Sequence, residues 1–301
     1  MSATDGRTEA GGWGGAGASG QDPKPSQPAL QDPRSAKQDP KDDAQAKAAA
    51  KKLVEAMKST FDEHGIIVDT DAGTVTIPAV MNSPRDPIEY LLIHRKGKMH
   101  EAMMFTKSQP SVINTALLLL GFEKGKNASY REKDPMPTLE ELEAGVDPII
   151  ITPPSGRQYW MTVRFKDADG QKVEYAVEDL IYDLRGDGPL GKAAWYYIGG
   201  RMASLYKDEP EVYIADFEGN LVSVCYLLPD NHLGTIKHER ARDDQNWWLT
   251  DKCPMPETEI EFVFHKNKPK LVAAREKRLE AEGAPKEQPQ SEVPEGRNGG
   301  R

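Results

Sequence analysis

Three residues between positions 94 and 101 have side chains that suit catalysis or metal binding. His94 precedes the polar turn Lys96-Gly97-Lys98, and His100 and Glu101 follow it. Imidazole nitrogens and carboxylate oxygens act as zinc ligands and as general acids or bases, provided that they converge on one point. We therefore name His94 and His100 as candidate metal ligands, and His100 and Glu101 as candidate catalytic residues. The alternative is a set of cross-strand hydrogen bonds and ion pairs, and we favour it because the zinc motif H-E-x-x-H is absent from this segment.

Tryptophan side chains are a second group that could carry function. Trp195 begins the aromatic run Trp195-Tyr196-Tyr197, and Trp247 and Trp248 are adjacent. Such rings can line a groove for a ligand or a partner, but in a β-rich domain they more often cap the core. Trp195, Trp247 and Trp248 are thus candidate ligand or partner residues. The polar sequence around the adjacent pair makes its exposure the point to test.

The chain has two cysteines, Cys225 and Cys253. Two thiolates are too few for a four-thiolate zinc or iron–sulfur site, although the pair could form one disulfide in an oxidising compartment. Cys225 lies in an apolar run, where a thiol is normally inert packing. No phosphate-binding loop, dinucleotide fingerprint or nucleophile elbow occurs in the sequence, so no cofactor is predicted.

Composition and charge exclude two classes of protein. Lys and Arg number 39 against 48 Asp and Glu, and the net charge of -9 offers no electrostatic footprint for a nucleic acid. No stretch reaches the roughly 20 apolar residues of a membrane-spanning helix, so no transmembrane segment is predicted. The mean hydropathy of -0.66, with 26 Gly and 23 Pro, indicates that part of the chain lies outside any folded core.

The elements that would position these residues are those of a strand-rich α+β domain. Short alternating runs between Gly- and Asn-containing turns predict strands over 61–265. Residues 88–94 and 99–105 are predicted to form a hairpin whose turn holds Gly97. One helix is predicted over about 110–121, and because it is apolar on both faces we expect it to be buried nearly all round, at the centre of the core.

The predicted organisation is one globular domain between two polar tails. The domain covers 44–265, with an amphipathic helix over 44–61 docked on its edge, its core over 61–265 and a surface insertion over 122–148. Residues 1–43 contain three Gln-Asp-Pro repeats and are predicted to be a disordered Gly/Pro-rich linker. Residues 266–301 are predicted to be a polar charged tail. No apolar leader precedes the linker, so no secretory signal is predicted in the chain as given.

The order of several motifs resembles the bacterial YdjY-like domain family. These motifs are Glu89-Tyr90, the turn Gly97-Lys98-Met99-His100-Glu101, the helix from Pro110 to Gly121 with its four consecutive leucines, and Asp216-Phe217-Glu218-Gly219-Asn220. The resemblance implies a fold unit over most of 61–265, with Glu89, His100 and Glu101 as motif residues. It implies no biochemical activity, because none is established for the family. Members are often exported or attached to the envelope, which would suit a linker-like N-terminus and a Cys225–Cys253 disulfide.

Two functions follow from these observations. The first is a non-enzymatic cell-envelope or interaction module, whose partner is a protein or an envelope component; the alternative location is the cytoplasm. The second is a metal-assisted hydrolase or small-ligand-binding enzyme that uses His94, His100 and Glu101. We favour the first because the sequence carries no catalytic signature.

Overall fold

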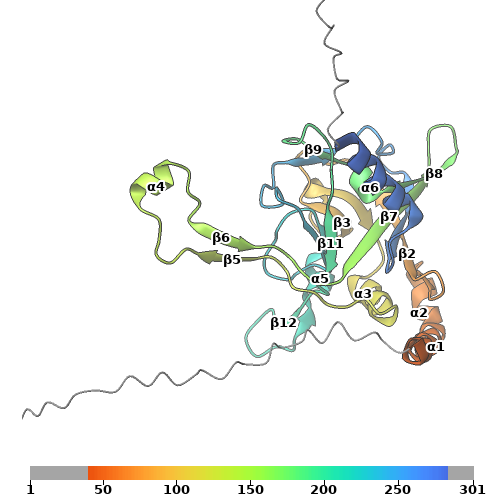
Figure 1. Ribbon diagram of the computed structural model, residues 1–301. Helices are drawn as coiled ribbons and strands as arrows, with labels where there is room; N and C mark the ends of the chain where they lie inside the picture. Colours follow the sequence, from red (N-terminus) through yellow and green to blue (C-terminus); the bar gives the residue numbers. More distant parts are fainter. Residues whose placement is uncertain (1–39, 284–301) are drawn as a thin grey trace, which may run out of the picture. The chain divides into compact units, whose positions relative to one another are not determined.

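Eight strands form a closed barrel at the centre of the structure (Figure 1). The structure is a computed structural model, and it describes residues 40–283. Pairing of the last barrel strand with the first closes the sheet and removes the edges that an open sheet would expose. The predicted class, a strand-rich α+β domain, is confirmed. Around the barrel the strands follow the order β2 (Thr74–Met81), β17 (Glu259–His265), β7 (Gln158–Lys166), β11 (Ala194–Tyr197), β15 (Gly234–Lys237), β14 (Asn220–Ser223), β3 (Tyr90–His94) and β4 (Ala102–Thr106).

The remaining elements flank the barrel. Strands β1 (Ile67–Asp69) and β8 (Lys172–Ala176) extend its sheet beside β2 and β7. Three smaller sheets pair β10 (Gly188–Pro189), β9 (Ile181–Asp183) and β16 (Trp247–Leu249); β12 (Met202–Ala203) and β13 (Val212–Tyr213); and β5 (Ser129–Glu132) and β6 (Ile149–Thr152). The helices are α1 (Pro40–Ala56), α2 (Lys58–Glu63), α3 (Pro110–Leu119), α4 (Leu139–Glu143), α5 (Ile214–Glu218) and α6 (Lys270–Gly283), with 3-10 turns η2 (Met99–Glu101) and η3 (Val177–Asp179).

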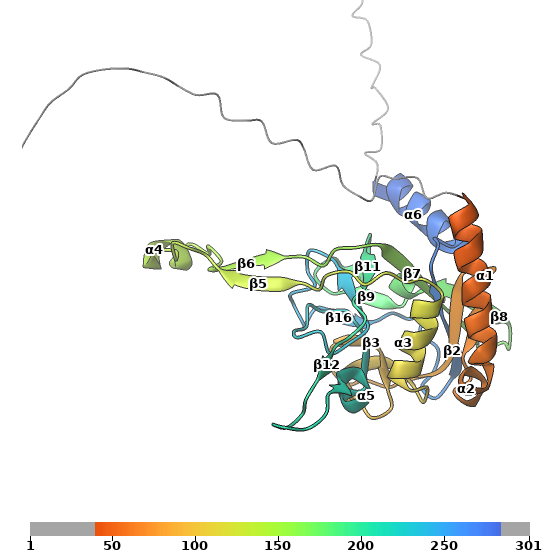
Figure 2. The ribbon, with the colours of Figure 1, turned by 90° about the horizontal axis from the view of Figure 1, so that it is seen from below.

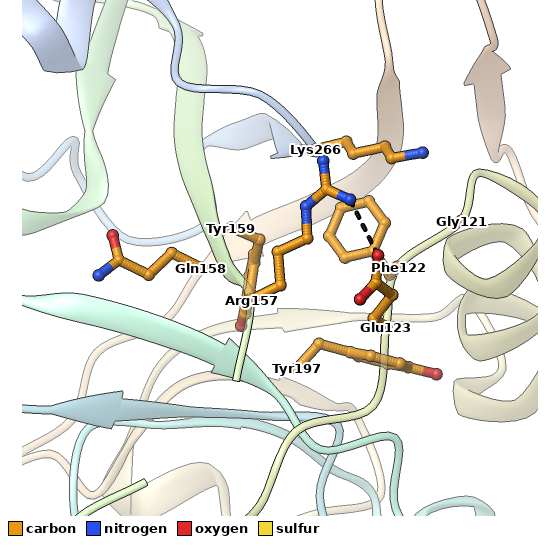
Figure 3. Close-up of a pocket in the computed structure, with 8 residues that line it drawn as sticks. All are labelled: Gly121, Phe122, Glu123, Arg157, Gln158, Tyr159, Tyr197 and Lys266. Carbon is orange, nitrogen blue, oxygen red and sulfur yellow. Dashed lines mark hydrogen bonds and ion pairs between the residues drawn. The ribbon is translucent and has the colours of Figure 1, made fainter. Parts of the chain in front are cut away.

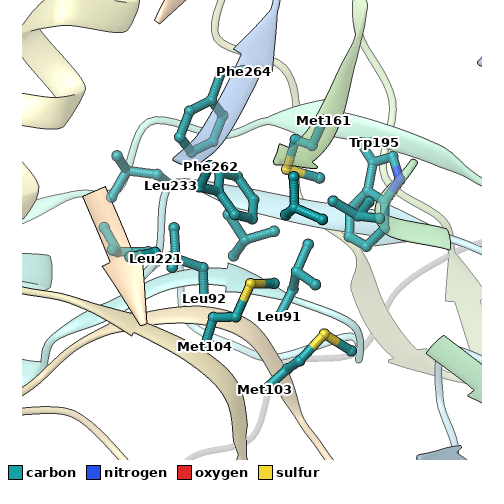
Figure 4. Packing of buried hydrophobic residues seen from close by; sticks show 14 of the residues in the cluster. Leu91, Leu92, Met103, Met104, Met161, Trp195, Leu221, Leu233, Phe262 and Phe264 are labelled. Carbon is teal, nitrogen blue, oxygen red and sulfur yellow. The ribbon is translucent and has the colours of Figure 1, made fainter. Parts of the chain in front are cut away.

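The barrel interior is filled by side chains, as expected for eight strands. The period-two pattern of β7 works as predicted, because Tyr159, Met161, Val163 and Phe165 are all buried. Phenylalanine, leucine and methionine side chains from strands far apart in sequence meet in this core (Figure 4). Labelled there are Leu91, Leu92, Met103, Met104, Met161, Trp195, Leu221, Leu233, Phe262 and Phe264.

The helix predicted over 110–121 is present as α3, but the expectation that it is buried all round is wrong. Ile113, Ala116 and Leu117 are buried, whereas Leu118 on the opposite side is 52% exposed. The helix packs on the outside of the barrel against β2 and α5, while the centre of the core lies inside the barrel. A closed barrel has no room for a helix among its own side chains, so α3 covers it on one face only.

The predicted hairpin of residues 88–94 and 99–105 is also wrong. Strands β3 and β4 pair in parallel, with Tyr90 opposite Ala102 and His94 opposite Thr106. Only residues 95–101 connect them, although parallel neighbours usually need a crossover of a dozen or more residues. Residues 95–101 return the chain from the end of β3 to the level of its start. The last three of them form η2 and lead into β4, which therefore runs in the same direction as β3.

The C-terminal boundary of the domain lies further along the chain than predicted. Residues 266–301 were expected to form a polar tail, but α6 docks on the domain through Val272 and Arg275, which are 3% and 6% exposed. The Arg275 Nε donates to Asp179 Oδ1 at 2.9 Å, and its other nitrogens reach the carbonyls of Leu190 and Gly191. One buried arginine thus anchors a helix whose composition suggested solvent on every side.

The N-terminal expectations are only partly open to comparison. The helix predicted over 44–61 is present as α1 and α2. Val54, Met57 and Phe61 pack against the core, Lys47 forms an ion pair with Asp71 at 2.9 Å, and Leu53 is 52% exposed. The predicted linker over 1–43 lies almost entirely outside the described residues.

Candidate functional site

The structure separates the residues that the sequence proposed as a metal or catalytic site. His94 ends β3 and His100 lies in η2, at the opposite end of the β3–β4 pair. The four-residue length of strand between those ends spans roughly 13 Å. Among the residues that the structure describes, no three His, Cys, Asp or Glu side chains come together to hold a metal ion. The geometry therefore gives His94, His100 and Glu101 no common centre, because the parallel pairing places the two histidines at different ends.

The same pairing brings together residues of two family-like motifs that are distant in sequence. The Lys98 Nζ lies 2.9 Å from Glu101 Oε2 and 3.3 Å from Glu89 Oε2, and His100 Nε2 lies 3.2 Å from Glu101 Oε1. The backbone N–H of Glu89 donates to the carbonyl of Glu101 at 2.9 Å. Glu89, Lys98, His100 and Glu101 thus form one charged cluster at the start of β3 and β4.

The two carboxylates of this cluster differ electrostatically. Burial raises the pKa of Glu89, with Lys98 opposing the effect and the neighbouring Glu101 adding to it. Burial would also raise the pKa of Glu101, but the hydrogen bond and charge of Lys98 outweigh it and the net shift is downward. Side-chain exposures of 17% for Glu89 and 21% for Glu101 leave both reachable by solvent. The cluster can hold charge and a proton, yet it lies on the surface rather than in a pocket.

Two glycines allow the tight connection that builds this cluster. A side chain on Gly97 would meet the Gly219 carbonyl at 2.9 Å, and one on Gly219, whose φ is 77°, would meet the Gly97 nitrogen at 2.7 Å. The turn after β3 therefore packs backbone against backbone with the turn before β14. Asn82 completes the support by donating its Nδ2 to the carbonyls of Met99 and Ala102.

Two of the three tryptophans are unsuited to contact a ligand or partner. Trp195 and Trp247 are 1% and 0% exposed, and Trp195 Nε1 donates to the buried Glu178 Oε1 at 2.8 Å. Trp247 packs edge-on against His238 with ring centroids 5.3 Å apart. Their candidacy is corrected, because both belong to the core. Trp248 is 37% exposed, so the adjacent pair points to opposite sides of β16.

The two cysteines are free thiols in the structure, and the candidate Cys225–Cys253 disulfide of an oxidising compartment stays a prediction. Cys225 is buried in the core, and burial raises its pKa well above the usual value. The Cys253 Sγ donates to the Leu180 carbonyl at 3.4 Å, and burial raises its pKa to about 11. Both thiols therefore stay protonated at neutral pH, which makes them poor nucleophiles.

The described surface has two hollows that could hold a ligand. The first has aromatic walls, and the Arg157–Glu123 ion pair lies at its mouth (Figure 3). Its free volume of about 10 Å³ is far below the several hundred Å³ of typical ligand pockets. The second is shallow, and its three arginines each have a carboxylate partner: Arg185 with Asp243, Arg240 with Asp183, and Arg242 with Asp147. Neither hollow is an enclosed pocket with free polar groups.

The most distinctive surface is instead an arm formed by residues 126–155, within and just beyond the predicted insertion. Strands β5 and β6 make a two-stranded ribbon that extends away from the barrel and ends in α4 (Figures 1 and 2). The pairing of Lys126 with Ser155 marks its start, and Tyr130 Oη donates to the Tyr226 carbonyl at 3.1 Å. Asn127 Nδ2 adds a hydrogen bond to the Leu227 carbonyl. These contacts anchor the lower part of the ribbon, and the ion pair of Arg242 with Asp147 ties the far end of β6 to the domain as well.

The tip of the arm, residues 134–147, is ordered but exposes apolar side chains. Thr138 and Glu141 form a capping box at the start of α4, a local motif that stabilises a helix N-terminus without tertiary contacts. No residue of α4 is buried. The large apolar side chains exposed here, with their exposed fractions, are Met136 (52%), Leu139 (72%), Leu142 (38%) and Val146 (36%).

The tip is also strongly acidic. It contains five carboxylates and neither lysine nor arginine, so its formal charge is -5. The carboxylates are Asp134, Glu140, Glu141, Glu143 and Asp147. An exposed apolar surface rimmed by charge is typical of a protein contact site. The sequence carries this signal in the T-L-E-E capping box and its flanking leucines, which predict a surface insertion with a short helix near 138–142 but do not predict a contact surface.

The comparisons with known proteins give one match. The YdjY domain family matches residues 66–230, more than half of the chain, from just before β1 to beyond β14. No curated protein and no solved structure matches the chain. Among residues 40–283, no helix combines the length and the apolar character needed to cross a bilayer. The matched segment contains both the charged cluster around Glu101 and the whole arm. The protein belongs to the YdjY domain family.

Proposed function

We propose that the protein is a non-enzymatic interaction module that binds a protein partner through the tip of its arm. One observation carries the proposal: an ordered tip holds four large apolar side chains in solvent, at the end of a ribbon that extends from the barrel. Exposing Leu139 and its neighbours to water costs free energy that only a contact can recover. The capping box keeps this surface in one conformation, so little entropy is lost when a partner binds.

The chemistry of the tip describes the partner that it would fit. Four apolar side chains need an apolar groove. The four carboxylates other than Asp147, which pairs with Arg242, favour lysine or arginine around that groove. Charge attraction of this kind mainly accelerates association, and it weakens as salt is added. A protein surface meets these requirements. The net charge of the chain disfavours a nucleic acid, as argued above.

Site-specific photo-crosslinking tests the proposal. A benzophenone amino acid replaces Leu139 in the full chain, expressed in cells of the source organism, and adducts are identified by mass spectrometry. The matched control places the same probe at Met255, which lies outside the arm. The two positions are similarly exposed, 78% for Met255 and 72% for Leu139. We expect defined protein adducts from position 139 only. Absence of adducts at 139, or the same adducts from both positions, would contradict an arm-mediated contact.

We also propose that the protein works at the cell envelope. The support is the family resemblance, whose other members are often exported or envelope-attached, and the alternative is the cytoplasm. Fractionation of the source organism, followed by detection of the chain in cytoplasmic, periplasmic and membrane fractions, distinguishes the two. Recovery in the cytoplasmic fraction alone would remove the envelope part of the proposal and leave the interaction module in place.

A further inference from the structure

One edge of the arm is an unpaired strand. Strand β6 pairs with β5 on one side, and within residues 40–283 no strand pairs with its other side. Lys133 donates its N–H to the Pro148 carbonyl at 2.8 Å, so the alternate pairs Arg131–Ile150 and Ser129–Thr152 are the hydrogen-bonded ones. The backbone groups of Ile149 and Ile151 therefore point outward from the ribbon, where the Ile149 N–H donates to the Asp147 Oδ1 at 2.8 Å. This edge can accept a further strand.

The side chains of β6 favour such pairing. Three consecutive isoleucines, residues 149–151, form its first three positions, and all are half-buried. Ile151 and its cross-strand partner Tyr130 pack against the domain core, so Ile150 lies on the opposite face of the ribbon. Edge strands are usually protected by charges, and β5 carries Arg131 and Glu132. Strand β6 carries none, and an isolated two-stranded ribbon is only marginally stable.

Charge along the arm suggests which strand is added. The tip, residues 134–147, has a charge of -5, whereas the base of the arm, residues 123–126 and 155–157, has Lys124, Lys126 and Arg157 against the single carboxylate Glu123. Asp147 is paired with Arg242, and Arg157 is paired with Glu123. The other four carboxylates of the tip, with Lys124 and Lys126 at the base, still make one end of the arm negative and the other positive. Two arms laid side by side in opposite directions would each place an acidic tip beside a basic base.

We infer that the arm binds a second copy of this chain, by antiparallel pairing of β6 with β6 across a two-fold axis. The inference rests on the proposed function, because it names the partner of the same arm. With Ile150 on the axis, Ile149 in one copy pairs with Ile151 in the other, and the two ribbons form a four-stranded sheet. In this pairing the Ile149 N–H exchanges the Asp147 carboxylate for the partner's Ile151 carbonyl. Such a contact uses the same surface twice, as two-fold dimers do.

The dimensions of the arm agree with this arrangement. At about 3.3 Å per residue, Ser155 at the base lies roughly 16 Å from Ile150. In the other direction Asp147 lies roughly 10 Å away along the strand, and α4 continues beyond it. The tip of one arm therefore reaches the level of its partner's base. The acidic tip then faces Lys124, Lys126 and Arg157.

Cysteine crosslinking at the axis tests the inference. In this register the two Ile150 side chains are a directly opposed, non-hydrogen-bonded pair with Cα atoms about 4.5 Å apart, within the range that a disulfide spans. Under mild oxidation of the full chain we expect Ile150→Cys to form a covalent dimer. The matched control is Thr152→Cys on the same strand, whose two copies would lie roughly 13 Å apart and should stay monomeric. The unmodified chain controls for Cys225 and Cys253. Equal crosslinking at positions 150 and 152, or none at 150, would overturn the register.

Charge exchange gives a second, independent readout. Sedimentation equilibrium of the unmodified chain should show a dimer that weakens as salt is added. Reversing the tip (Glu140→Lys with Glu143→Lys) or the base (Lys124→Glu with Lys126→Glu) should each raise the dimer dissociation constant by at least about tenfold. An equimolar mixture of the two variants should restore dimers, since each tip then meets an opposite base. A monomer at all concentrations, or reversals without effect, would overturn the inference. If the chain is monomeric but position 139 crosslinks a different protein, the proposed function stands and the second copy is excluded.

Discussion

Acidification should destabilise the fold through one buried histidine. His232 precedes β15 and is 1% exposed, with its Nε2 lacking a hydrogen-bond partner. Burial lowers the pKa of His232 from 6.5 to about 4, with Asp230 opposing the effect. Between these two values the unfolded chain binds a proton at this position that the folded chain does not. The free energy of unfolding therefore falls as pH falls from about 6.5 towards 4.

The size of the effect follows from the two pKa values. Between pH 7 and pH 5, a shift from 6.5 to 4 corresponds to a loss of about 2 kcal/mol of unfolding free energy. That loss is a large part of the 5–15 kcal/mol typical of a domain. Other groups titrate in the same interval, so the useful quantity is the difference between the unmodified chain and a variant that cannot titrate here.

Urea unfolding at pH 7 and pH 5, followed by tryptophan fluorescence, measures this difference. Between pH 7 and pH 5, the unfolding free energy of His232→Leu should fall by about 2 kcal/mol less than that of the unmodified chain. This difference does not depend on the stability of the variant at pH 7. Met255→Leu is the control, because this side chain is 78% exposed and carries no titratable group, so the substitution should leave the pH dependence unchanged. If the unmodified chain and His232→Leu lose the same free energy between pH 7 and pH 5, the imidazole is not held neutral by burial and the reasoning fails.

Three further predictions concern the limits of the domain and the charged cluster. A chain that ends at residue 230, where the family match ends, should show no cooperative thermal unfolding by circular dichroism, while one that ends at 283 should unfold cooperatively. The shorter chain lacks β17, whose four buried apolar side chains stabilise the fold by about 1.5–3 kcal/mol each. Arg275→Met should lower the unfolding free energy by about 3 kcal/mol, because it leaves the buried Asp179 carboxylate without its ion-pair partner. Arg278→Met removes only an exposed contact at 3.8 Å and should lower it by less than about 1 kcal/mol. Equal losses in urea titrations would refute the anchoring role of Arg275. Lys98→Met should raise the pKa of Glu101, since it removes the ammonium that holds this pKa down, and carboxyl-carbon NMR titration would refute the electrostatic account if the midpoint did not move.

Much of the local structure was predictable because it depends on neighbours in sequence. The alternation of buried side chains from Tyr159 to Phe165 specifies β7, as the short alternating runs predicted. Pro110 and Gly121 marked the ends of α3 to within two residues. The motif order also indicated the family, which the match over residues 66–230 confirms.

The candidate site was less predictable, since it depends on which segments become neighbours in space. His94 and His100 are six residues apart in sequence but lie at opposite ends of a strand pair, while Glu89 and Glu101 are twelve apart and share Lys98. The arm was missed as a candidate for a different reason. Its capping box is visible in the sequence. Leu139 is exposed because the ribbon holds α4 away from the barrel, and the spacing of apolar residues along the chain does not predict that placement.

The sequence by itself determined the class of the domain, the faces of its long strands, the span of α3 and the absence of recognisable catalytic motifs. Those properties arise from side-chain alternation, helical spacing and the conformational preferences of Gly and Pro, which act within a few residues. Only the tertiary structure decided that β3 and β4 run parallel, that β2 meets β4 to close the barrel, and that α6 docks through Arg275. Periodicity shows which face of an element is buried, but not which element covers it. That choice is made by the packing of the whole chain, and it separated the predicted metal ligands and set the arm apart as a surface for a partner.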